Sequence, residues 1–206
     1  MLPEMKKKKA DIRSIVDKAI DDSKLLSELL EGLKSRDETF RYNCHKVLMI
    51  VTETHAELLY PSWDFFVEHL SSNNSYHKMS AVHLIANLVK VDTENRFEKI
   101  IDKYYGLLDD RSMVVAYYVA QNSAKIIRAK PELENRIAGK LLDIDTTHHP
   151  SGRKELIKAG IIEAFDEICE DTGNKPVITE FVRNQLGSES NKTRKTAKAF
   201  LEKWGG

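Results

Sequence analysis

Apolar residues recur along this chain with a helical period, and the same arrangement occurs in five segments. In the C-terminal stretch NKTRKTAKAFLEKW the least polar positions are spaced at 0, +4, +7, +8 and +11, which places them on one face of an α-helix. Segments with the same spacing start at Phe40, His77, Met113, Arg153 and Thr193. Their separations of 37, 36, 40 and 40 residues predict a structural repeat.

A second helical segment precedes each of these helices. The leading segments read KLLSELLEGLKS, PSWDFFVEHLSS, ENRFEKIIDKYYGLLDD, PELENRIAGKLLDID and KPVITEFVRNQLGS. Pro61, Pro131 and Pro176 fall in the first turns of three of them, where the missing N–H has no helical partner to lose. The segment MVVAYYVA is rich in strand-forming residues, but it keeps the repeat register and is predicted to be helical. The chain is therefore expected to be all-α.

Two further positions keep the register of the second helices. Three residues before each start stand Asp37, Asn74, Asp110, Pro150 and Ser190. All except the proline are good N-cap residues, and Ser151 is the alternative cap in the fourth copy. One residue after four of the five starts the chain carries a basic residue: Arg41, Lys78, Lys154 and Arg194.

Helix pairs with this period, a capped second helix and a basic residue after its first core position resemble HEAT repeats, in the same broad class as armadillo solenoids. The positions that carry the resemblance are Asp37 with Arg41, Asn74 with Lys78, and Ser190 with Arg194. It spans about residues 23–204, and Val114 and Pro150 depart from the pattern. The resemblance implies an all-α, right-handed α-solenoid of about five HEAT-like helix pairs.

Such an array needs capping elements at its ends, because only a neighbouring pair can cover each apolar face. Residues 1–22 are expected to form a basic tail and a capping helix, within ADIRSIVDKAIDD. Lys6 to Lys9 oppose the dipole at the start of that helix and are expected to be frayed or disordered. Residues 23–206 are predicted to form one continuous domain, with repeats at approximately 23–58, 59–92, 93–130, 131–172 and 173–206.

Composition narrows the class of function. The 206 residues include 32 basic and 32 acidic ones. Zero net charge argues against an overall positive electrostatic field that would attract polyanions. No apolar run approaches the roughly 18 residues of a membrane span, so no membrane partner is expected. Cys44 and Cys169 are far apart and unpaired by any motif, which fits a reducing cytoplasmic location.

Catalytic, cofactor and metal sites are not expected. His148 and His149 stand in DIDTTHHPSG beside Asp143 and Asp145, but adjacent histidines should point apart, and a metal needs three or four converging ligands. The chain holds no GxSxG, P-loop or GxGxxG motif. Cys44 falls on the core face, which makes it a poor nucleophile. The aromatics Trp63, Tyr104 and Tyr105 are expected to serve packing.

The resemblance implies that the second helices line a concave surface, with positions +2, +5, +6 and +9 facing outward. The expected partner-binding residues are Tyr42, Lys46, Met49, Met79, Val82, His83, Val115, Tyr118, Val119, Asn122, Glu155 and Lys158. Their apolar members would form an exposed patch, which usually marks an interaction surface. Burial of these residues by curvature or by the capping helix is the alternative.

The expected function is that of a non-catalytic scaffold or adaptor that binds another protein or peptide along this surface. One alternative is nucleic-acid binding through the lysines of the N-terminal tail and the basic residues of the last repeats, including Lys154, Lys158, Arg194, Lys195 and Lys198. The others are an accessory role beside an enzyme, and self-association through the same patch. The charge balance and the apolar middle of the chain favour a protein partner.

Overall fold

The computed structural model describes residues 3–205, and every regular element in that range is a helix. The chain divides into two compact units, with the boundary between Phe97 and Glu98. The all-α prediction is confirmed, whereas the single continuous domain expected for residues 23–206 stays a prediction. None of the described helices is both long and apolar enough to cross a membrane.

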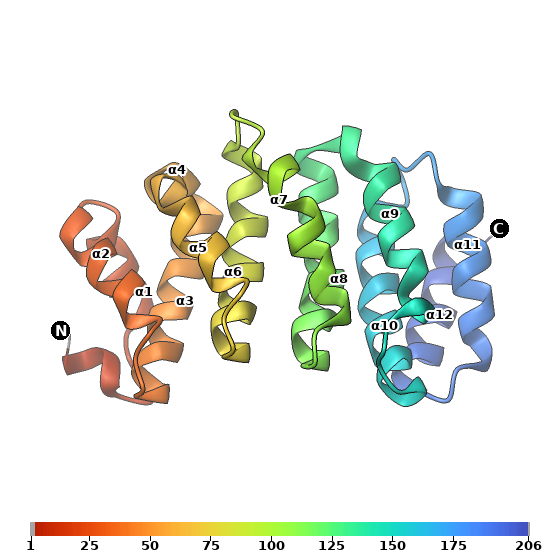
Figure 1. Cartoon of the computed structure of the whole chain (residues 1–206), viewed down its shortest axis with the longest axis horizontal. Helices are drawn as coiled ribbons and strands as arrows, with labels where there is room; N and C mark the ends of the chain where they lie inside the picture. The colour runs from red at the N-terminus through yellow and green to blue at the C-terminus, as the bar shows by residue number, and fades with distance from the viewer. Residues whose placement is uncertain (1–2, 206) are drawn as a thin grey trace. The chain divides into compact units, whose positions relative to one another are not determined.

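The first unit contains the predicted capping helix and the first two helix pairs (Figure 1). Its elements are η1 (Pro3–Lys6), α1 (Ile12–Ala19), α2 (Ser23–Gly32), α3 (Glu38–Thr54), α4 (Ala56–Leu59), η2 (Tyr60–Ser62), α5 (Trp63–His69), α6 (Ser75–Leu88) and η3 (Val89–Val91). The leading helix of the second pair is interrupted, because Pro61 lies in the short 3-10 turn η2 directly before α5. Helices α2 and α5 pack against the second helices α3 and α6.

The second unit contains the remaining three pairs, and the first two residues of α7 precede its boundary. The elements are α7 (Arg96–Tyr105), η4 (Gly106–Asp109), α8 (Met113–Ala129), η5 (Pro131–Leu133), α9 (Glu134–Leu142), η6 (Asp143–Thr146), α10 (Ser151–Ile168), α11 (Lys175–Asn184), η7 (Gln185–Gly187) and α12 (Asn191–Trp204). The strand-like segment MVVAYYVA forms the start of α8. Every predicted helix pair is therefore present.

Side-chain caps start three of the second helices, as predicted. Asp37 on α3, Asn74 on α6 and Ser190 on α12 each accept a hydrogen bond from an N–H of the first turn, at 2.9 to 3.3 Å. Such a bond satisfies one of the amides that the helix itself leaves without a partner. The cap residue therefore determines where these helices begin.

The other two predicted caps are wrong. Helix α8 begins two residues later in the register than the other second helices, so its N-cap is Ser112 and Asp110 lies outside the helix. Asp110 instead accepts the N–H of Ser112 at 2.8 Å, within the preceding turn. Pro150 occupies the N-cap of α10, and Ser151 is already the first helical residue without a capping hydrogen bond.

The basic residues after the first core position bind the turn that precedes their own helix. The guanidinium of Arg41 donates to the Ser35 carbonyl at 2.8 Å, and that of Arg194 donates to the Ser188 carbonyl at 2.5 Å. Lys154 donates to the Asp145 carbonyl at 2.7 Å. These cations satisfy carbonyl groups that would otherwise lack a partner, and thus hold the turn between the two helices of a pair.

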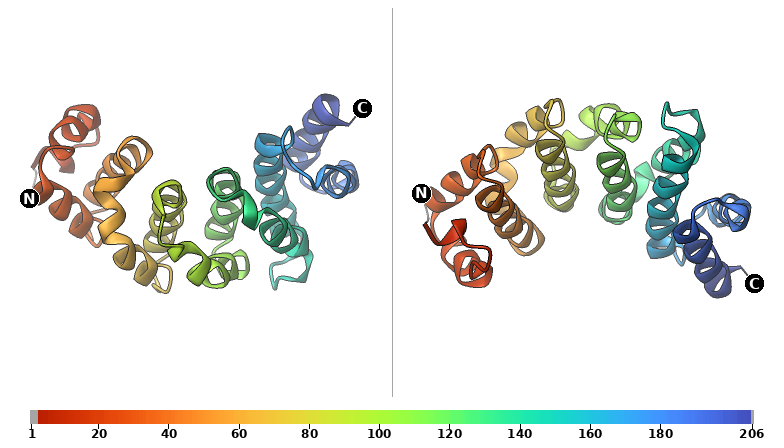
Figure 2. Two further views of the ribbon diagram at one scale, coloured as in Figure 1. Left: turned by 90° about the horizontal axis from the view of Figure 1, so that it is seen from above. Right: turned by 90° about the horizontal axis from the view of Figure 1, so that it is seen from below.

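The second helices lie side by side within each unit: α3 beside α6, and α8, α10 and α12 in that order (Figure 2). Gly160 permits the close approach of α10 to α8, since an added Cβ would lie 3.0 Å from the ring of Tyr117 and 3.2 Å from its carbonyl oxygen. Contacts that short displace a neighbour. Helix α10 is thus covered on both flanks, by α8 and by α12.

Large side chains of the leading helices form much of the core. Trp63, Tyr104 and Tyr105 are buried, which confirms their expected role in packing. On α12, Phe200 is fully buried while the lysines lie at the surface. The C-terminal basic stretch is therefore an amphipathic helix that closes the second unit, as the pattern predicted.

Candidate functional site

A hollow opens on the first unit between the N-terminal halves of α3 and α6. Its volume is about 390 Å³. We call it the tyrosine hollow; it is lined by Lys8, Glu38, Thr39, Arg41, Tyr42, Asn43, His45, Tyr76, Met79 and Ser80. Because α3 and α6 are both second helices, this hollow lies on the kind of surface that the repeat pattern assigned to a partner.

Two tyrosines at the hollow are exposed. Tyr42 is 58% exposed and Tyr76 is 54% exposed. A cation lies over each ring: Lys46 Nζ is 4.7 Å from the centroid of Tyr42, and the Arg41 guanidinium is 4.7 Å from that of Tyr76. These contacts hold the rings in place while leaving much of each ring accessible. Aromatic side chains with one wet and one apolar part are well suited to binding a partner.

A histidine pair extends the hollow inward. The rings of His45 and His83 lie 5.8 Å apart. Burial, and to a smaller extent the neighbouring His83, lower the pKa of His45 to about 4. The buried Nδ1 of His45 has no hydrogen-bond partner among residues 3–205. His45 is therefore neutral at physiological pH and presents an uncharged ring to the hollow.

The N-terminal segment forms one wall of the hollow and is ordered, so the expectation that Lys6 to Lys9 are frayed is wrong. The side-chain amide of Asn43, on α3, donates to the carbonyls of Met5 at 2.7 Å and of Lys7 at 3.0 Å. Met5 itself is fully buried. The sequence interpretation assigned no role to Asn43 or Met5. The signals that could have found them were a polar residue next to the core positions of α3, for Asn43, and a methionine beside a run of lysines, for Met5.

Four of the twelve expected partner-binding residues lie at or next to this hollow. Tyr42 and Met79 line it, Lys46 lies over Tyr42, and His83 lies beside His45. Met49 lies further along α3, where its sulfur receives the Asn87 amide at 3.9 Å. These residues come from two neighbouring second helices, as the register predicted.

The apolar members of the expected patch are mostly not at the surface. Val82, Val115 and Val119 are all 0% exposed. Asn122 is also buried, and its amide donates to the Tyr118 carbonyl at 2.8 Å. The expected exposed patch over these residues is therefore wrong, because α6 and α8 each pack against several elements of their own unit and so bury more than one stripe of side chains.

Tyr118 lies in a second, smaller hollow of about 240 Å³ in the second unit. Met113, Val114, Tyr117, Leu156 and Lys192 line it as well. Tyr117 donates its hydroxyl proton to Glu163 at 2.6 Å, and Lys192 Nζ lies 2.5 Å from the same hydroxyl and 3.1 Å from Glu163. The charged groups here satisfy one another, and Val114, 48% exposed, is the most exposed apolar residue of this hollow.

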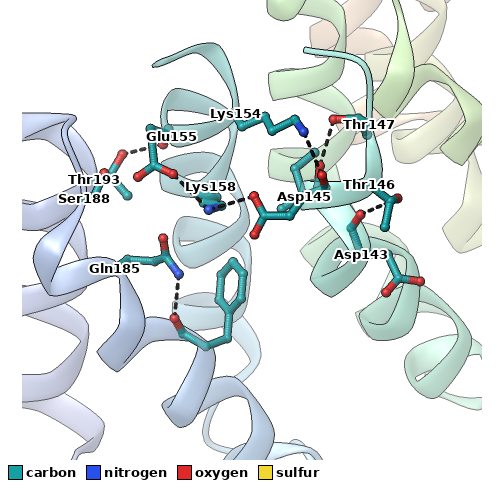
Figure 3. A network of polar contacts seen from close by, with 12 residues as sticks. Asp143, Asp145, Thr146, Thr147, Lys154, Glu155, Lys158, Gln185, Ser188 and Thr193 are labelled. Atoms are coloured by element: carbon teal, nitrogen blue, oxygen red, sulfur yellow. Dashed lines mark hydrogen bonds and ion pairs between the residues drawn. The ribbon is translucent and has the colours of Figure 1, made fainter. Parts of the chain in front are cut away.

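Glu155 and Lys158 belong to an internal polar network (Figure 3). Lys158 Nζ lies 2.9 Å from carboxylate oxygens of both Asp145 and Glu155, and the lysine is only 7% exposed. Burial opposes the charge, but the hydrogen bonds to Glu155 and Asp145 outweigh it and raise the pKa of Lys158. The Thr193 hydroxyl donates to the Glu155 carbonyl at 2.5 Å. This network ties η6 and α12 to α10, so Lys158 is not the accessible flanking charge that we expected.

The two adjacent histidines also serve the fold. We expected their rings to point apart, but the rings stack with centroids 4.7 Å apart. His148 Nδ1 lies 2.5 Å from Asp109, and His149 Nε2 lies 3.0 Å from the Leu108 carbonyl. Within residues 3–205, no group of three or more His, Cys, Asp or Glu side chains is placed to hold a metal ion.

Sequence comparison finds neither a protein-family model nor a curated protein that matches this chain. Comparison of structures does find similar folds. A designed armadillo repeat protein, solved in complex with the peptide (KR)4, has a TM-score of 0.57 at 17% sequence identity, covering 94% of this chain and 91% of that one. Another designed armadillo repeat protein has a TM-score of 0.52 at 19% identity, covering 91% of this chain and 84% of that one.

The chain therefore has an armadillo/HEAT-like α-solenoid fold, as its helix pairs and register indicated. At such low sequence identity the similarity concerns the fold alone, since one fold carries many functions.

Proposed function

We propose that this protein is a non-catalytic binding module that docks a segment of another protein in the tyrosine hollow. The observation that carries the proposal is the pair of exposed tyrosines, Tyr42 and Tyr76, on either side of a hollow between adjacent second helices. Exposed, well-oriented aromatics are common anchors of protein interfaces. Met79 adds a flexible apolar side chain that can adapt to different partner residues.

Two further observations support a binding role. A designed protein of the same fold was solved in complex with a peptide, which supports peptide binding as a role for this fold. In addition, the Cys44 thiol on the core face of α3 is unsuited to nucleophilic chemistry, because burial raises its pKa to about 12. Both cysteines are free and buried, and a cytoplasmic location remains part of the proposal.

Peptide display against the full-length protein tests this function. Peptides enriched on the wild type should bind it with measurable affinity, and Tyr42→Ala combined with Tyr76→Ala should weaken binding by about tenfold or more, since anchor truncations often exceed 1.4 kcal/mol. Because both side chains are more than half exposed, the variant should keep the thermal stability of the wild type.

The matched control is Val177→Ala combined with Leu186→Ala, which truncates two exposed apolar side chains in the second unit. This variant should bind the enriched peptides as the wild type does. Equal affinity of all three proteins, or enrichment of no peptide at all, would show that the tyrosine hollow is not a docking site.

A further inference from the structure

Several cations of the first unit line the tyrosine hollow or lie next to residues that line it. Lys8 and Arg41 line it, and Lys46 lies over Tyr42. Lys6, Lys7 and Lys9 flank Lys8 in the same exposed segment. Acidic and basic residues nearly balance over residues 1–97, so this gathering is a local feature and not a consequence of net charge.

These cations are not neutralised by the protein itself. Lys6 to Lys9 form no ion pair with any other described residue, and the same holds for Lys46. The guanidinium of Arg41 is used by a backbone carbonyl and by the Tyr76 ring, neither of which carries a negative charge. Glu38 is the single carboxylate among the lining residues of the hollow. The hollow therefore presents an excess of positive charge.

The structure also holds these charges in position. The Asn43 amide binds two carbonyls of the N-terminal segment, and buried Met5 anchors it against α3. A segment that is already ordered loses less conformational entropy when a ligand binds. The basic stretch thus acts as a fixed wall of the hollow.

We propose that the tyrosine hollow selects acidic peptide segments, with partner carboxylates beside Lys7, Lys8 and Arg41 and an aromatic or apolar anchor between Tyr42 and Tyr76. This inference rests on the proposed function and adds the chemistry of the partner. Complementary charges determine which partners are accepted and how fast they associate. The anchor uses the ring faces and Met79, which a charge-only interaction would leave unused.

A peptide fits these features better than a nucleic acid does. The hollow combines its cations with apolar surface, the uncharged ring of His45 and the carboxylate of Glu38. A phosphate backbone is recognised by a continuous basic track, and Glu38 interrupts such a track at this site.

Fluorescence anisotropy with three short labelled peptides tests the inference on the full-length protein. The peptides share a central Trp-Phe anchor and carry flanks of Glu, Ser or Lys. The Glu-flanked peptide should bind about tenfold more tightly than the Ser-flanked one, and the Lys-flanked peptide should bind most weakly. Lys7→Gln combined with Lys8→Gln should lower the affinity for the Glu-flanked peptide by about tenfold. The affinity for the Ser-flanked peptide should change little.

Lys99→Gln combined with Lys195→Gln is the matched control, because it removes two exposed lysines of the second unit. It should leave every affinity unchanged. If the three peptides bind equally and Tyr42→Ala with Tyr76→Ala abolishes binding, the hollow is a docking site but the charge selection is wrong. If no peptide binds, the inference and the proposed function both fail.

A labelled single-stranded RNA serves as the competing probe. The RNA could bind more tightly than the Glu-flanked peptide, lose its binding with Lys7→Gln and Lys8→Gln, and keep it with both tyrosines truncated. That result would replace the peptide inference with nucleic-acid binding. Weaker binding of the RNA, with steep salt dependence, is the expected result.

Discussion

Residues at one register position of the second helices differ widely in exposure. Position +2 is occupied by Tyr42, Met79 and Val115, of which Tyr42 is 58% exposed, Met79 is half-buried and Val115 is 0% exposed. Helix α8, which carries Val115, is covered within its unit by α9, α10, η4 and η5. The neighbours of each helix, and not the register alone, therefore decide whether a residue can touch a partner.

Val119→Glu should destabilise the protein without testing recognition. Val119 is fully buried, so the substitution places an unpaired carboxylate in the core and should cost on the order of 4 kcal/mol. Val114→Glu on the same helix is the control, because Val114 is 48% exposed and should change stability by about 0.5 kcal/mol or less. Urea denaturation measures both, and equal midpoints would contradict the burial of Val119.

The pH dependence of stability should report on His45. Its pKa is lowered from 6.5 to about 4 in the folded protein by burial and by His83, so the unfolded chain binds the proton more readily. Stability should therefore be fully present above pH 6.5 and decline as the pH falls towards 4, by on the order of 2–3 kcal/mol. His45→Gln should flatten this part of the profile, since it removes the titrating group. An unchanged slope in that variant would assign the effect to other groups.

Helices with the same role begin with different chemistry. Helices α3, α6 and α12 start with a side-chain cap, whereas α8 and α10 start without one. In α8 and α10 the turn before the helix is held by other contacts, such as Asp110 with the N–H of Ser112 and Lys154 with the Asp145 carbonyl. The second helices thus start by different mechanisms, and α8 also starts two residues later in the register than the others.

Cap substitutions should separate these two groups of helices. Asn74→Ala and Ser190→Ala each remove a first-turn hydrogen bond and should lower stability by about 1 kcal/mol. Ser112→Ala removes no capping bond and should fall within about 0.5 kcal/mol of the wild type. Chemical denaturation of the three variants provides the comparison, and a loss of about 1 kcal/mol in Ser112→Ala would place an unrecognised cap on α8.

At the scale of the whole molecule, stability in a repeat array is the sum of contacts between neighbours. In the second unit α10 packs against two other second helices, α8 and α12. Helix α12 packs against one second helix, α10, and against the leading elements of its own pair, α11 and η7. Damage to α10 should therefore affect more of the unit than damage to α12 does.

Hydrogen exchange should show this difference. Phe165→Ala on α10 and Phe200→Ala on α12 remove side chains that are 0% and 1% exposed, at a similar expected cost of about 3–5 kcal/mol. Phe165→Ala should raise exchange in α8, α10 and α12 together, whereas Phe200→Ala should raise it mainly in α11 and α12. Equal exchange in α8 for both variants would show that the unit opens as a single block.

The sequence by itself determined the helix pairs, their period and most of their starting points, because these depend on local patterns of apolar residues and caps. The armadillo/HEAT-like class followed from the same register. Tertiary structure decided which outward positions remain exposed, as Tyr42 and Val115 show. It also brought Asn43 to the N-terminal segment and Lys158 to Asp145. Such contacts join residues that are distant in the chain or separated by a turn, and their geometry arises only when neighbouring helices pack.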